Sequence, residues 1–136
     1  MVQRNVSSDP RRAQTVPVAP PAGTLLWILQ RLTSYGLLLF LAVHLYFTYF
    51  GHLDTAAPLT FEILKRPFQV YPFIYALNEG LLLVCALFHG LNGVRNIIYD
   101  WTTHAGLRRG VSVALLLLGL GFAGYGFYIL AALVSN

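Results

Sequence analysis

The chain has 136 residues, of which 57% are hydrophobic and 10% are charged, and its mean hydropathy is +0.63. Water-soluble domains average roughly 25% charged residues, so this composition excludes an ordinary soluble domain, a disordered chain and a nucleic-acid-binding protein. The single cysteine, Cys85, excludes an intrachain disulfide, and no zinc-type Cys/His spacing surrounds it. We therefore predict one membrane domain.

The predicted elements begin with an N-terminal segment outside the bilayer, residues 1–24. This segment is rich in proline and arginine, which predicts an extended or disordered chain. It lacks the apolar core and small-residue cleavage site of a secretory signal. Residues 25–136 form the predicted membrane domain.

Three charge-poor stretches predict membrane-spanning helices at about 25–50, 72–100 and 108–133. Each exceeds the roughly 20 apolar residues that a helix needs to cross a bilayer. Residues 51–71 are interrupted by Pro58 and Pro67, which predicts a connecting loop, with a short interfacial helix as an option. The fold class is thus an all-α integral membrane protein with three transmembrane helices.

The distribution of basic residues predicts the orientation, because Lys and Arg favour the cytoplasmic side of a membrane. The loop between the first two helices carries only Lys65 and Arg66, and the C-terminal tail carries neither Lys nor Arg. We therefore expect the N-terminus in the cytoplasm and the C-terminus outside. Seven basic residues flank the opposite helix ends: Arg4, Arg11, Arg12, Arg31, Arg95, Arg108 and Arg109.

Polar residues inside a membrane are costly and usually face a cofactor, a cavity or a partner. The second predicted helix carries a stripe of them at helical spacing. Its members are Asn78, Cys85, His89, Asn92, Gly93, Asn96 and Asp100. Gly90 and Gly93 beside His89 would let a planar ligand or another helix approach closely.

The first predicted helix offers a second histidine, His44, with Gln30 and Thr33 on nearly the same face. Neutral imidazole is a preferred axial ligand of haem iron, and helix bundles present such ligands from facing helices. Packing histidines that hydrogen-bond a carbonyl are the alternative. We favour haem ligation most strongly for His89.

Other titratable residues carry weaker signals. His52 and His104 lie in the predicted loops, where ordinary surface roles are favoured, although His104 could relay protons near a quinone. Glu79 lies about two turns inside the second helix, and it either orients His44 or is protonated and hydrogen-bonded. Cys85 is predicted to be a small packing residue.

The segment from His89 to Trp101 resembles the second-helix signature of the membrane-anchor subunits of succinate:quinone oxidoreductase. His89, Gly93, Arg95 and Asp100 occupy the signature positions. The segment Gln30-Arg31-Leu32-Thr33-Ser34 is similar to the Arg-x-Ser/Thr segment of the first helix in this family. The chain departs from the family pattern at Gln30, where a His is frequent, and at Ser34, where a Gly is frequent.

The resemblance implies a bundle formed with a second anchor subunit, which binds haem b and holds an iron–sulfur subunit and a flavoprotein at the membrane. It implies that His89 ligates haem b and that His44 ligates a second haem in a two-haem member. Arg31 and Arg95 would pair with haem propionates or a quinone carbonyl. Asp100 and Trp101 would stand near the quinone, where Trp101 can donate a hydrogen bond but cannot supply a proton.

By this resemblance the chain is a subunit of succinate dehydrogenase that carries electrons from succinate to quinone, and it is not an enzyme alone. It has neither the dinucleotide-binding glycine pattern nor the cluster cysteines that succinate oxidation needs. Two alternatives remain open from the sequence. One is a fumarate reductase anchor, and the other is a non-redox three-helix structural or assembly protein.

Overall fold

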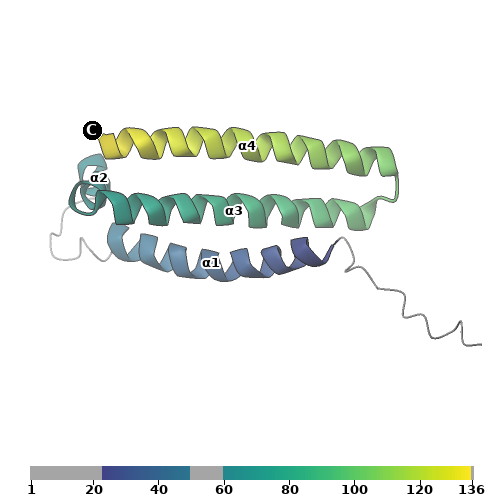
Figure 1. The fold of residues 1–136 in the computed structure, drawn as a ribbon, viewed down its shortest axis with the longest axis horizontal. Coiled ribbons are helices and arrows are strands. Elements are labelled where there is room, and N and C mark those ends of the chain that lie inside the picture. Colours follow the sequence, from purple (N-terminus) through teal and green to yellow (C-terminus); the bar gives the residue numbers. More distant parts are fainter. Residues whose placement is uncertain (1–22, 50–59, 136) are drawn as a thin grey trace, which may run out of the picture.

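The computed structural model describes residues 23–49 and 60–135, which form four helices (Figure 1). These are α1 (Thr24–Thr48), α2 (Phe61–Val70), α3 (Pro72–Trp101) and α4 (Ala105–Ser135). Three of them, α1, α3 and α4, are long and apolar enough to span a membrane. The predicted fold class is thus confirmed. The predicted N-terminal segment lies almost wholly outside the described residues.

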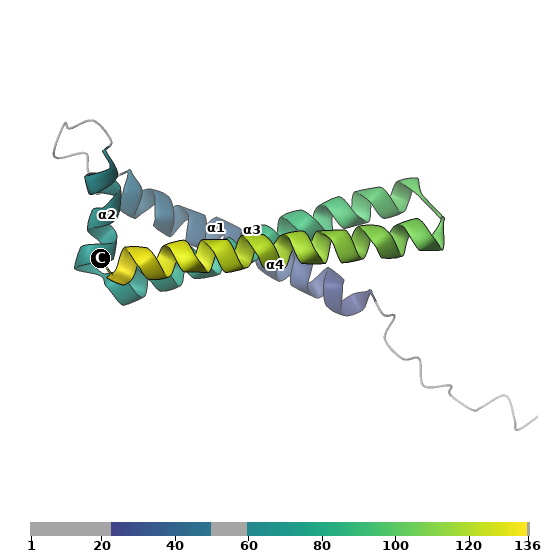
Figure 2. The same ribbon diagram turned by 90° about the horizontal axis from the view of Figure 1, so that it is seen from above.

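Each long helix runs antiparallel to the one before it, and α3 lies between α1 and α4 (Figure 1). The start of α1 and the α3–α4 turn therefore share one end of the molecule, and α2 lies at the other end. Figure 2 shows that α1 crosses α3 at an angle, so that the N-terminal end of α1 diverges from the C-terminal end of α3. This divergence leaves the last turns of α3 without cover from α1.

Local interactions fix the ends of α3 and the turn into α4. Pro72 occupies the first turn of α3, where its missing N–H costs no hydrogen bond. At the other end the Arg108 guanidinium donates to the carbonyls of Tyr99 and Thr102, both at 2.7 Å. The Nδ1 of His104 accepts from the backbone N–H of Leu107 at 3.3 Å. Because His104 caps α4, this helix begins at Ala105, three residues before the predicted start.

The predicted option of a short helix before the second span is confirmed by α2. Thr60 precedes it, and its hydroxyl accepts from the backbone N–H of Ile63 at 3.4 Å. The helix buries Pro67 and Phe68 against the bundle and exposes Phe61. The Phe68 ring packs edge-on against Tyr75 with 4.7 Å between ring centroids. The helix is therefore amphipathic and lies across the end of α3 and α4 (Figure 2).

The described part of the chain buries few large side chains, namely Phe68 and Tyr75, together with the amides Asn78 and Asn92. Most leucines of the long helices face outwards, as Leu117 does with 63% of its surface exposed. Apolar surfaces of this extent suit contact with lipid and with other membrane helices. Small residues and polar contacts therefore hold the three spans together.

Candidate functional site

The polar stripe of α3 faces α1 over most of its length. Asn78 donates to the backbone carbonyl of Phe40 at 3.3 Å, and Asn92 donates to the Gln30 side-chain oxygen at 2.7 Å. Both amides are 8% exposed. The far end of the stripe, Asn96 and Asp100, is exposed because α1 has diverged there. The stripe is thus mainly the interface between α1 and α3.

His89 lies within this interface and is half-buried. Its Nδ1 is 3.2 Å from the backbone oxygen of Gln30 and 3.3 Å from the Gln30 Nε2. The same amide nitrogen donates to the His89 carbonyl at 3.1 Å. One glutamine therefore contacts both the ring and the backbone of His89. A side-chain carbon added at Gly90, the next residue, would meet no atom of the rest of the molecule within 4 Å, so the helix surface is open at Gly90.

His44 lies near the opposite end of the bundle and has a carboxylate partner. Its Nδ1 is 2.8 Å from an oxygen of Glu79, and 33% and 14% of these two side chains are exposed. The contact agrees with one of the two options for Glu79, namely that it orients His44. Both residues line a cavity of about 280 Å³ beneath α2, together with Lys65 and Tyr75. His44 and His89 belong to separate sites.

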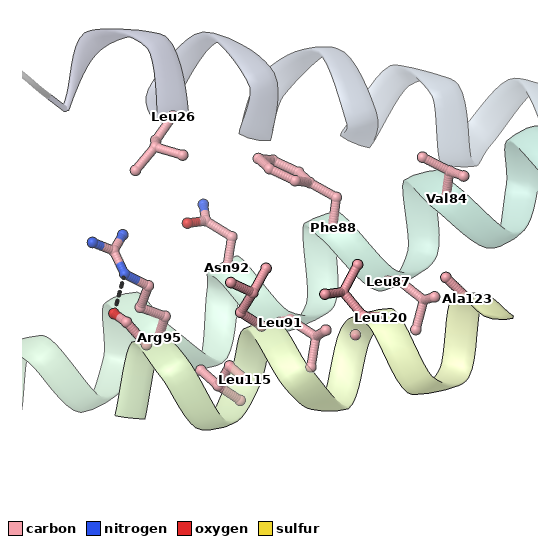
Figure 3. Close-up of a pocket in the computed structure, with 13 residues that line it drawn as sticks. Leu26, Val84, Leu87, Phe88, Leu91, Asn92, Arg95, Leu115, Leu120 and Ala123 are labelled. Atoms are coloured by element: carbon pink, nitrogen blue, oxygen red, sulfur yellow. Dashed lines mark hydrogen bonds between the residues drawn. The ribbon is translucent and has the colours of Figure 1, made fainter. Parts of the chain in front are cut away.

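A larger cavity of about 480 Å³ lies between α3 and α4 (Figure 3). Leu26 of α1 closes one side of it, and Arg95 and Ser112 lie at one end. The Arg95 Nε donates to the Ser112 hydroxyl at 3.1 Å. Neither His44 nor His89 lines this cavity.

The structure does not bring Arg31 and Arg95 together. Arg31 is exposed on α1, where its guanidinium stacks over the Trp27 ring at 4.3 Å. Arg95 is turned to α4 and stacks over Tyr99 at 4.4 Å. The two arginines thus offer their charges on different sides of α3.

Comparison with known proteins adds to this geometry. Residues 6–127 match the family described as succinate dehydrogenase/fumarate reductase transmembrane subunit. The chain belongs to this family. It is also 36% identical over 110 residues to the succinate dehydrogenase hydrophobic membrane anchor subunit of Archaeoglobus fulgidus, covering 78% of this chain and 86% of that relative. No solved structure matches the chain.

The protein is therefore a membrane anchor subunit of the succinate dehydrogenase/fumarate reductase family, and it associates with the other subunits of such a complex. In this anchor subunit Asp100 and Trp101 lie exposed at the end of α3, with 88% of Trp101 accessible. The Asp100 side chain makes no hydrogen bond with the other described residues. His104 caps α4, which agrees with an ordinary loop role, and His52 lies outside the described residues.

The sequence patterns did not pair Gln30 with His89. The sequence feature that could have predicted this pair is the position of Gln30 on the same helix face as Thr33 and His44. In the antiparallel arrangement of α1 and α3, that face of α1 packs against the polar stripe of α3. The sequence patterns also missed the Tyr99 hydroxyl, which lies 2.6 Å from the Ser112 hydroxyl and donates to the Arg108 carbonyl at 2.9 Å.

Proposed function

We propose that this anchor subunit binds haem b through His89 and helps to form a quinone site, in a complex that passes electrons from succinate to quinone. The partners are a second anchor subunit, an iron–sulfur subunit and a flavoprotein. The observation that carries the proposal is the contact of the His89 Nδ1 with the Gln30 backbone oxygen at 3.2 Å. Histidines that ligate a metal commonly donate their second ring N–H to such a carbonyl.

The residues around His89 fit a haem. A carbonyl oxygen only accepts hydrogen bonds, so the contact with Gln30 favours a proton on Nδ1. That tautomer leaves the lone pair of Nε2 for a metal ion. The amide of Gln30 has its own acceptor in the His89 carbonyl, so it does not need the ring nitrogen. Gly90 keeps the adjacent helix surface free of side chain.

A bound haem supplies a one-electron carrier between the iron–sulfur centres and quinone. Because His89 is the one imidazole at this position in the described part of the chain, we propose that the partner anchor subunit would supply the other protein ligand of the iron. His89 would hold the iron, and Gln30 would fix the orientation and protonation of its ring.

His44 is a secondary candidate for a second haem. Its contact with Glu79 resembles the carboxylate–histidine arrangement of many metal ligands. The adjoining cavity of about 280 Å³ is small, since sites for organic ligands typically occupy about 300–1,000 Å³. The support for a haem here is therefore weaker than at His89.

We propose that Arg31, Asp100 and Trp101 take part in a quinone site, because all three are exposed in the half of the bundle that ends at the α3–α4 turn. Arg31 follows Gln30 at the level of His89, and Asp100 and Trp101 lie at the end of α3. An arginine can donate to a quinone carbonyl or a haem propionate. Arg31 suits this role better than Arg95, because Arg95 contacts α4 whereas His89 contacts α1. The positive charges at this end support a cytoplasmic location for it, with the C-terminus outside.

Haem content tests the central proposal. We expect the isolated complex to show a b-type band in its reduced-minus-oxidised spectrum, at one haem per complex or two if His44 also ligates. A complex that oxidises succinate without such a band would contradict the proposal. The ratio of succinate oxidation to fumarate reduction, measured with quinone and quinol, separates the two directions that the family description covers.

Arg31→Leu tests the quinone site. Loss of a charged hydrogen bond should slow quinone reduction by about tenfold or more, while succinate oxidation by a soluble artificial acceptor is retained. Arg109→Leu, which removes an exposed charge from α4, is the matched control. Unchanged quinone turnover in an assembled Arg31→Leu complex would remove Arg31 from the site.

A further inference from the structure

The cavity between α3 and α4 is an apolar groove with a cation at one end. Its three polar lining residues, Asn92, Arg95 and Ser112, lie in the half nearer the α3–α4 turn (Figure 3). The remaining lining residues are apolar. They are Leu26, Val84, Leu87, Phe88, Leu91, Leu115, Leu116, Gly119, Leu120 and Ala123.

The length of the groove matches one leaflet of a bilayer. Its lining runs from Arg95 to Val84 on α3 and from Ser112 to Ala123 on α4. Eleven residues of helix span roughly 16 Å at 1.5 Å per residue. Half of the hydrocarbon core is about 15 Å thick. A lipid acyl chain lying in the groove would thus reach from the polar end to the bilayer centre.

The guanidinium of Arg95 has donors to spare. Its Nε donates to Ser112 and its guanidinium also contacts the Tyr99 side chain, whereas a guanidinium has five N–H donors. Figure 3 shows the terminal nitrogens turned away from that bond. They therefore lie free at the polar end of the groove.

The electrostatic setting of Arg95 favours an anion. Arg95 and Arg108 stack on the same Tyr99 ring, at 4.4 and 5.0 Å, so two positive charges lie close together. In the described part of the chain the one ion pair is His44 with Glu79, so no carboxylate neutralises either arginine. Positive charge beside the membrane surface attracts acidic lipid headgroups.

We propose that this groove binds one anionic phospholipid, with its phosphate on Arg95 and an acyl chain between α3 and α4. A quinone, being neutral, would leave the charge of both arginines uncompensated. Neither His89 nor Gln30 lines the groove, although Asn92, which does, donates to the Gln30 side chain. Lipid binding in this groove can therefore be tested separately from haem content.

The first test removes the charge. The complex is reconstituted in phosphatidylcholine vesicles containing phosphatidylglycerol, extracted in mild detergent, and its retained lipids are counted by native mass spectrometry. We expect one phosphatidylglycerol per anchor subunit, falling about tenfold in Arg95→Gln because a charged hydrogen bond is lost. Arg109→Gln removes an equal charge one residue beyond Arg108 and should retain the lipid.

The second test fills the groove and leaves Arg95 in place, so it does not depend on the folding of Arg95→Gln. Leu120→Trp places bulk in the groove and should also displace the lipid. Leu118→Trp, at an exposed position outside the lining, should not. Equal retention of phosphatidylglycerol in both Arg95→Gln and Leu120→Trp would overturn the proposal. Equal retention of phosphatidylcholine by the wild type, or a quinone retained in place of lipid, would overturn it as well.

Discussion

Two intramembrane histidines differ in the partner of the same ring nitrogen. The Nδ1 of His89 lies against the neutral backbone oxygen of Gln30, whereas the Nδ1 of His44 lies against the carboxylate of Glu79. A carbonyl oxygen accepts a hydrogen bond without adding a charge, whereas an ionised carboxylate is a charged acceptor. The two residues are therefore expected to respond differently to substitution.

Replacement of His89 by Leu should abolish the b-haem absorbance of the site, or leave a five-coordinate iron with a high-spin spectrum. Succinate oxidation by a soluble acceptor should persist in complexes that assemble. The measurement is the low-temperature absorption spectrum of the purified complex together with its haem-to-protein ratio. His104→Ala is a control, because His104 caps a helix end. A full low-spin signal at wild-type stoichiometry would mean that His89 is not a ligand.

Replacement of His44 by Leu should remove one haem only if a second haem exists. In a one-haem complex it should leave the haem ratio unchanged and lower stability by about 1–3 kcal/mol, because the Glu79 carboxyl loses its His44 partner and keeps only others such as Asn78. The double variant His44→Leu/Glu79→Gln should recover part of that stability. The haem ratio and the thermal midpoint of the complex separate the two cases, and a constant haem ratio rejects His44 as a ligand.

At the scale of elements, small residues set the distance between spans. A side-chain carbon on Gly36 would lie 2.8 Å from the Cys85 sulfur, and one on Gly126 would lie 2.5 Å from Leu83. These separations are too short for van der Waals contact, so α1 and α4 approach α3 only because glycine is present. Packing of this kind supplies the association that the hydrophobic effect does not supply within lipid.

Gly36→Ala should destabilise the α1–α3 contact by about 1–3 kcal/mol through overpacking against Cys85. Cys85→Ala in the same chain should restore most of the loss, because it removes the sulfur that the new methyl group meets. Gly121→Ala is the matched control, since nothing lies within 4 Å of that position. Thermal stability of the complex in detergent provides the measurement. Equal losses of thermal stability in Gly36→Ala and in the double variant Gly36→Ala/Cys85→Ala would show that the new methyl group does not clash with Cys85.

The sequence was sufficient to predict the three spans, because charge-poor apolar runs of this length typically form transmembrane helices. The second-helix signature was sufficient to indicate the family. The partner of His89 was not predictable, since the angle between α1 and α3 decides which residue of α1 meets it. The position of Arg95 was missed for a similar reason, because its hydroxyl partner Ser112 belongs to the next span.

For the molecule as a whole, the alternation of the spans puts the start of α1 and the α3–α4 turn at one end, and α2 with the end of α4 at the other (Figure 1). The first end carries Arg108 and Arg109, and the second carries Lys65 and Arg66 on α2. Arg4, Arg11 and Arg12 precede α1 in the sequence. When these residues are counted with the first end, the excess of basic residues predicts that this end faces the cytoplasm.

A reporter fused after Asn136 tests this direction. Alkaline phosphatase should be active there and a fluorescent protein dark, because the C-terminus is expected outside. The same reporters fused after Thr103, in the α3–α4 turn, should show the reverse pattern. Fluorescence at the C-terminus together with phosphatase activity at the turn would establish the opposite orientation.

The outward-facing leucines have a consequence for the subunit before it meets its partners. Its hydrogen bonds join its own helices, as those of Asn78 and Asn92 do, and hydrocarbon covers the outside. Such a surface offers few polar groups by which another membrane helix could recognise the subunit. Recognition of other helices of the complex is therefore expected to depend mainly on shape complementarity between apolar side chains.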